Sequence, residues 1–102
     1  MKHLILITHT DYQQDLSDQL RNLEQVSGFT FSQVEGHGVE EESDPFLSAR
    51  ESVVGHTSRI RLDILLQDKD VDTVLNTLSS SINGIEGHGI YWVTAVEKKG
   101  HL

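Results

Sequence analysis

Residues 58–66 read Ser-Arg-Ile-Arg-Leu-Asp-Ile-Leu-Leu, and the rest of the chain can be organised around this stretch. Apolar side chains stand at every second position from Ile60 to Leu66, with Arg59, Arg61 and Asp63 between them. A period of two is typical of a β-strand that buries one face in a core. We expect the two arginines to pair with Asp63 or with acids on a neighbouring strand.

Three further strands are expected, two before this one in the chain and one after it. The continuous apolar run Leu4 to Ile7 is typical of a central strand buried on both faces. The two others alternate, and Phe29 and Phe31 share one face of the first of them. The expected strands are residues 2–8, 29–34, 58–66 and 90–96.

Two helices are expected between the strands. Thr10 with Gln13 forms a capping box, and Gly28 fits the left-handed position that ends a helix. Asp68 can cap the second helix, and Gly84 can stop it. Their apolar stripes follow helical spacing: Tyr12, Leu16, Leu20 and Leu23 in the first, and Val71, Val74, Leu75, Leu78 and Ile82 in the second.

The resulting order is β-α-β-β-α-β in a single domain covering residues 1–102. Right-handed crossovers then favour an α+β, ferredoxin-like sandwich, with an antiparallel sheet of strand order 4-1-3-2 and both helices on one face. Phe31, Ile90 and Trp92 supply apolar surface on one side of the sheet or the other. A sheet face left open in so small a chain predicts oligomerisation.

Composition excludes several classes of function. The net charge of −8 leaves no basic face for nucleic acid, and no apolar run is long enough to insert into a membrane. There are no cysteines, which excludes disulfides and thiolate metal sites, and we expect a cytoplasmic protein. No activated serine, P-loop or carboxylate pair stands out, so we expect no enzymatic activity.

The tetrapeptide Glu-Gly-His-Gly occurs twice, at residues 35–38 and 86–89. In the expected topology both copies lie at one end of the sheet, together with His9 and His56. Imidazole and carboxylate suit a divalent transition metal, which makes His37 and His88 candidate ligands. The alternative is turn chemistry, because the two copies flank opposite edge strands, roughly 14 Å apart. His9 and His56 are interpreted as loop surface residues.

Residues 36–57 form a long connection without either periodicity. The connection contains the acidic run Glu40, Glu41 and Glu42 and the only proline, Pro45. Connections of this length are usually functional or disordered.

The order of these segments resembles that of the PII signal-transduction proteins, in particular a divergent, short PII-like group of proteobacteria. Residues 29–38 (FTFSQVEGHG) are similar to the strand that enters the PII T-loop, and residues 50–54 to the segment that leaves it. Residues 59–64 resemble the next PII strand, and residues 87–93 (GHGIYWV) the B-loop.

This resemblance implies a homotrimer whose T-loop reports an effector to a partner such as a membrane transporter. The partner-binding loop would include Glu40, Glu41, Glu42 and Leu47. The implied effector-binding residues are Thr30, Gly36, His37, Gly38, Glu51, Gly87, His88 and Gly89.

The departures from the PII pattern remove groups that hold anions. Ile90 stands where PII proteins have the B-loop lysine, and Glu40 where they have a T-loop glutamine. ATP or ADP is therefore a less expected ligand than in PII proteins. The leading hypothesis is a non-enzymatic regulator. The alternative is a metal-binding sensor or buffer linked to heavy-metal efflux or tolerance.

Overall fold

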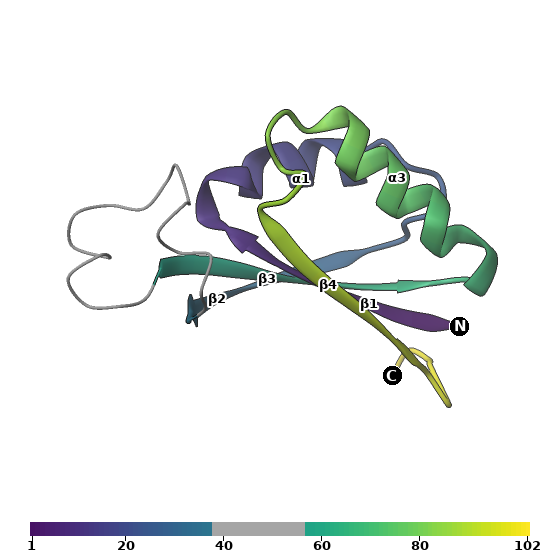
Figure 1. The fold of residues 1–102 in the computed structure, drawn as a ribbon. Helices are drawn as coiled ribbons and strands as arrows, with labels where there is room; N and C mark the ends of the chain where they lie inside the picture. The colour runs from purple at the N-terminus through teal and green to yellow at the C-terminus, as the bar shows by residue number, and fades with distance from the viewer. Residues whose placement is uncertain (38–56) are drawn as a thin grey trace.

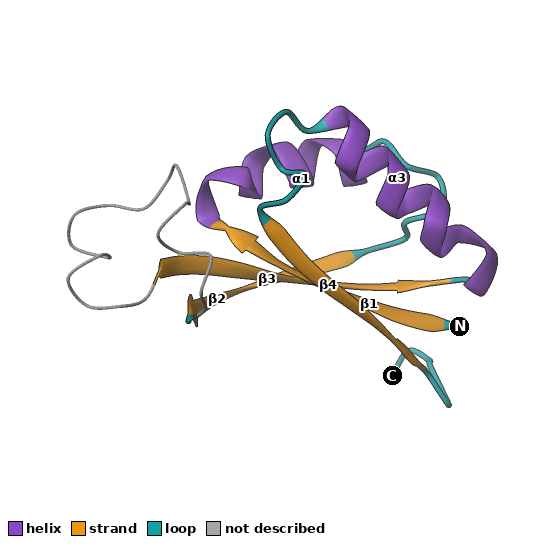
Figure 2. Cartoon of the chain, viewed as in Figure 1, coloured by secondary structure: helices purple, strands orange, loops and turns teal. Residues whose placement is uncertain are grey.

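The computed structural model describes residues 1–37 and 57–102, and the following concerns those residues (Figure 1). Four strands and two α-helices follow one another in the order β-α-β-β-α-β (Figure 2), and a short 3-10 helix precedes each α-helix. In chain order the elements are β1 (Lys2–His9), η1 (Thr10–Tyr12), α1 (Gln13–Arg21), β2 (Phe29–Gly36), β3 (Thr57–Leu66), η3 (Asp68–Asp70), α3 (Val71–Ser81) and β4 (Gly89–Ala95).

The four strands form one sheet in the order β2-β3-β1-β4, and all three strand pairs are antiparallel. Both α-helices cover the same face of this sheet (Figure 2). The order is the one expected from the sequence, read from the other edge, so the predicted α+β sandwich with a ferredoxin-like arrangement is confirmed. Within the described residues no helix is long and apolar enough to span a membrane.

The hydrophobic core lies between the sheet and the two helices. From the strands it takes every second residue, so that Leu4 and Leu6 on β1 stand opposite Ile64 and Leu62 on β3. These four side chains are at most 7% exposed. The helices complete the core with the predicted stripes, of which Leu16, Leu20, Val74 and Leu78 are buried.

Both helices begin differently from the prediction. His9 caps the first turn, since its Nδ1 accepts the Asp11 backbone N–H at 3.1 Å, whereas Thr10 is already the first residue of η1. The strand therefore runs directly into the helix, and the capping position falls one residue earlier than the Thr10 motif indicates. Asp68 is not the cap of α3 either, because Gln67 precedes η3 and Asp68 binds the N-terminal ammonium at 2.6 Å.

The helix ends also differ. α1 ends at Arg21, seven residues before Gly28, and Gly28 does not have a positive φ. The segment between them turns through backbone hydrogen bonds from Asn22, Leu23 and Val26 instead. Gly84 does adopt a positive φ of 84°, but α3 has already ended at Ser81, so this glycine shapes the following turn.

The second face of the sheet, opposite the two helices, exposes apolar side chains of β4. Trp92 and Ile90 stand opposite Ile5 and Ile7 on this open face, and they are 41% and 62% exposed. Phe31 belongs to the other face, because its register partner is the core residue Leu62. The sequence left this assignment undecided, and the register settles it.

Candidate functional site

The two Glu-Gly-His-Gly copies lie at the same end of the sheet, as their positions in the chain predict. The first begins with the last two residues of β2, where Gly36 stands opposite Thr57, the first residue of β3. The second leads into β4, where Gly89 stands opposite Thr8 near the end of β1. They flank opposite edge strands, which places them roughly 14 Å apart across the sheet.

The first copy is a solvent-facing pair of titratable side chains. His37 Nε2 lies 3.8 Å from Glu35 Oε2, and the two side chains are 64% and 70% exposed. Gly36 between them has a packing role, because a Cβ at this position would collide with the side chain of Arg59 on β3. Gly38, the last residue of this copy, lies outside the described residues.

The second copy is a hydrogen-bonded turn anchored to the sheet. Gly87 has a φ of 83°, a conformation that costs an L-residue roughly 1–2 kcal/mol and so favours glycine. The His88 backbone N–H donates to the carbonyl of Ile85 at 2.9 Å. The carbonyl of His88 in turn accepts from the fully buried hydroxyl of Thr8 at 2.7 Å. This backbone is fixed by contacts within the chain, and His88 itself is partly exposed.

Replacing Thr8 with valine tests how firmly this turn is anchored. The substitution removes the donor to the His88 carbonyl, so we expect the free energy of unfolding to fall by about 1–2 kcal/mol. Urea denaturation followed by circular dichroism measures the change. Thr77→Val is the matched control, because Thr77 bonds the carbonyl of Thr73 one turn earlier in an exposed part of α3. Equal losses in the two variants would contradict an anchoring role of Thr8.

His9 differs most from its prediction. It was interpreted as a loop surface residue, yet it is only 4% exposed because its ring folds back to cap η1. Its position beside Arg59 in the register does bring it to the predicted end of the sheet. Within residues 1–37 and 57–102, no group of three or more histidine, aspartate or glutamate side chains is arranged to hold a metal ion.

The remaining predicted site residues are divided between the open face and the undescribed segment. Thr30 is exposed and stands opposite Asp63, on the open face of the sheet. Thr30 therefore does not join the two histidine turns. The other predicted effector and partner residues lie outside the described residues, as does the second loop histidine: Glu40, Glu41, Glu42, Leu47, Glu51 and His56.

A charged cluster at the centre of the open face had been predicted only in part. Asp63 accepts hydrogen bonds from Arg61 Nε at 3.1 and 3.2 Å and from Arg61 Nη2 at 3.0 Å. The same carboxylate lies 2.7 Å from His3 Nε2 on the neighbouring strand. The Arg61–Asp63 pair was expected from the alternation within β3. His3 was not, since only the register of β1 against β3 brings it there.

The cluster is electrostatically matched. The hydrogen bond from Arg61 lowers the pKa of Asp63, and the hydrogen bond from His3 lowers it further, while partial burial opposes both. The same pairing raises the pKa of Arg61. Asp63 and His3 are 25% and 28% exposed, so a paired, charged patch stands beside the apolar side chains of the open face.

The sequence matches a protein family over its whole length, and the fold is similar to that of a solved structure. The model of a family described as "Protein of unknown function (DUF3240)" matches residues 1–102. A similar solved structure is the crystal structure, at 2.40 Å resolution, of a DUF3240 family protein from Shewanella baltica OS155. The TM-score is 0.78 at 22% sequence identity, over 99% of this chain and 94% of that one. A search of curated proteins found no match. Since the family model spans the whole length, this chain belongs to the DUF3240 family.

Proposed function

We propose that this chain is a non-enzymatic, PII-like regulatory protein whose 36–57 connection reports a bound effector to a partner such as a transporter. One observation carries the proposal. Both ends of the connection, Gly36 and Thr57, leave the sheet at the end where the second Gly-His-Gly turn is anchored. An effector held at that end would lie beside the base of the connection.

The mechanism is a change in the order of the connection rather than a chemical step. An effector that contacts the base of the connection and the His88 turn together favours one arrangement of the connection over others. A partner that binds this arrangement preferentially binds more tightly when the effector is present. By linkage, the partner increases the affinity for the effector by the same factor. The acidic run Glu40 to Glu42 gives the connection a preference for a basic partner surface.

The proposal includes a homotrimer in which the open sheet faces point inward. Exposed Ile90 and Trp92 give this face an apolar surface that an isolated chain leaves in water. The Arg61–Asp63–His3 cluster supplies paired polar groups beside it. The helix-covered side then forms the outer surface of the assembly.

Deleting residues 40–48 should abolish partner binding while leaving the domain folded. Side chains of β1, β3, α1 and α3 pack against one another in the core, so the thermal midpoint is expected to change little. The experiment crosslinks partners to the tagged protein in its native cells, identifies them by mass spectrometry, and compares wild type with the deletion variant. A variant with the same nine residues in scrambled order separates composition from sequence. Unchanged partner binding by the deletion variant would refute the proposed role of this segment in partner binding.

The exposed Glu35–His37 pair favours a second candidate function, binding of a divalent transition metal for sensing or buffering. Because His88 lies at the opposite edge of the same sheet, a shared site would need either the connection or another copy of the chain to bring the two histidines together. ATP and ADP are the competing ligands, and in this proposal they bind less well than the metal because Ile90 replaces the phosphate-binding lysine of PII proteins.

Replacing both His37 and His88 with alanine should weaken zinc, copper or nickel binding at least about tenfold, as loss of inner ligands does. Titration calorimetry of each metal, and of ATP and ADP, into the wild type and the double variant measures this directly. His101→Ala is the control, because it removes an exposed imidazole from the C-terminal tail. Equal metal affinity of the double variant and the control would exclude these two histidines as ligands.

A further inference from the structure

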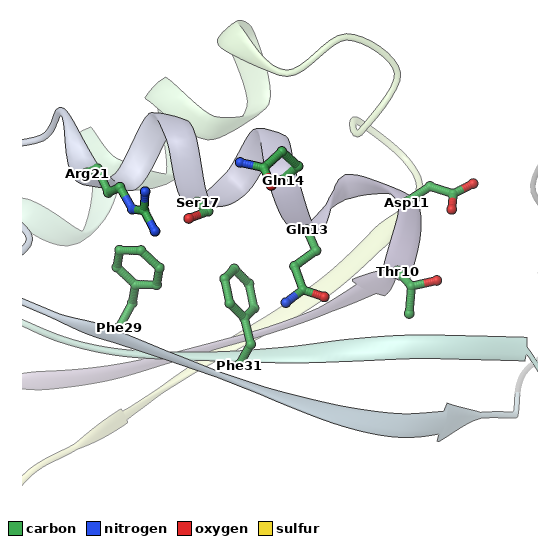
Figure 3. A pocket seen from close by; sticks show the side chains of 8 residues that line it. All are labelled: Thr10, Asp11, Gln13, Gln14, Ser17, Arg21, Phe29 and Phe31. Atoms are coloured by element: carbon green, nitrogen blue, oxygen red, sulfur yellow. The ribbon is translucent and has the colours of Figure 1, made fainter.

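A groove of about 530 Å³ runs along the helix-covered side of the molecule, between α1 and the edge strand β2 (Figure 3). It lies on the opposite side of the sheet from the open face. Two aromatic side chains of β2 form its floor, and polar side chains of η1 and α1 form its rim. Its lining residues are Thr10, Asp11, Gln13, Gln14, Ser17, Arg21, Phe29 and Phe31.

The floor is apolar and is not fully covered by the protein itself. The rings of Phe29 and Phe31 meet edge to face, with their centroids 5.6 Å apart. Both are partly buried against the core, through register partners Ile64 and Leu62, and their remaining surface faces the groove. Such a surface favours an apolar side chain placed over the two rings.

The rim has opposite charges at its two ends. Arg21 stands above the Phe29 ring, and Asp11 lies at the far end beyond Phe31 (Figure 3). The Asp11 carboxylate points outward from the rings, and its Oδ2 lies 3.7 Å from His9 Nδ1. No ion pair joins Arg21 to an acid within the described parts of the chain. The amide of Gln13 lies between these ends, and an amide can both donate to and accept from a peptide backbone. The amide of Gln14 donates to Asp18 Oδ1 at 2.9 Å instead. The charge order thus matches a ligand that is acidic at one end and basic at the other.

The length of the groove and the adjacent strand edge favour a peptide over a small molecule. From Thr10 to Arg21 the helical segment is roughly 17 Å long, which equals about five residues of extended chain. β2 is the outermost strand on its side, and within residues 1–37 and 57–102 no strand pairs with its outer edge. Its eight residues contain neither lysine nor proline, the residues that commonly block such edges.

We propose that this groove binds an extended segment of a partner protein, added as an antiparallel strand to the outer edge of β2. Its groove-facing side chains alternate along the segment: a basic residue at Asp11, two apolar residues over Phe31 and Phe29, and an acidic residue at Arg21. Backbone hydrogen bonds to the strand edge supply affinity, and the alternate side chains supply specificity. This interaction is independent of the 36–57 connection and of the histidine turns.

The test uses the labelled heptapeptide Lys-Thr-Val-Thr-Leu-Thr-Glu, whose odd positions carry the required charges and apolar side chains. Fluorescence anisotropy measures its affinity for the full chain, and amide chemical shifts locate it. We expect saturable binding, with the largest shifts in β2 and α1. Arg21→Glu should weaken binding about fivefold, the scale of reversing an exposed charge contact. A peptide ending in lysine instead of glutamate should recover affinity for that variant.

Lys69→Glu is the matched control, since it reverses an exposed cation of η3, outside the groove, and should leave the affinity unchanged. Circular dichroism establishes that both variants fold. No binding of the heptapeptide, equal losses in the two variants, or shifts confined to β4 would overturn the proposal. The deletion of residues 40–48 leaves the groove intact, so failure here and failure of the proposed function are distinguishable.

Discussion

Replacing Leu62 with alanine is expected to lower the free energy of unfolding by about 3–5 kcal/mol, the range for a fully buried leucine whose site cannot collapse. Leu62 is 0% exposed and occupies the middle of β3, one of the two strands paired on both sides in the described sheet. Its register partners are Leu6 on β1 and Phe31 on β2. Truncation therefore leaves a cavity bordered by strands on both sides, which cannot move in without breaking the ladder.

The measurement is denaturant unfolding at two protein concentrations, so that any contribution of assembly to stability is visible. Leu75→Ala is the control, because the same atoms are removed from a half-buried position on α3 and a smaller loss is expected. Since small domains are stable by only about 5–15 kcal/mol, Leu62→Ala should leave a large fraction unfolded at modest denaturant. Similar losses in the two variants would contradict the central place of β3 in the core.

Replacing Ile90 with aspartate is expected to convert the proposed trimer into single chains. Ile90 is 62% exposed in the isolated chain and stands on the open face opposite Ile7. In the proposed assembly this face is buried, where an unpaired carboxylate costs several kcal/mol per subunit. Light scattering should then report about 11.4 kDa for the variant, and three times that mass for the wild type.

Tyr91→Asp is the control for this prediction. Tyr91 neighbours Ile90 on β4 and is 55% exposed, but it stands opposite the core residue Leu6 and so belongs to the other face of the sheet. The control should keep the mass of the wild type. A wild-type protein that already has the mass of one chain, or a Tyr91 variant that dissociates as readily as the Ile90 variant, would contradict assembly through the open face.

The periodicities in the sequence predicted the strands, the helices and their order, because burial of one face imposes a period of two or of 3.6. The ends of the helices were predicted less well. Thr10 carries a capping motif, but the caps depend on where the chain leaves the strand, and His9 reaches the Asp11 N–H first. Gly28 fits a helix end in sequence, yet α1 stops at Arg21 and leaves it in an ordinary conformation.

The candidate sites also contain some features that the sequence predicts and others that only the tertiary structure shows. The Glu-Gly-His-Gly repeat is visible in the sequence, and the strand order alone brings its two copies to one end of the sheet. The anchoring of His88 by Thr8, 80 residues away, depends on the exact register of β1 against β4, which no local pattern encodes. The same holds for the approach of His3 to Asp63 across β1 and β3.

The amino-acid pattern was thus sufficient for the elements, the sheet order and the expectation that one sheet face stays open, since each follows from local periodicity and chain connectivity. It was not sufficient for the assignment of Phe31 to the core side and Ile90 to the open side. Nor did it indicate the groove between α1 and β2. These features arise where residues distant in the chain are paired at a particular register, and a shift of one residue would reverse every face.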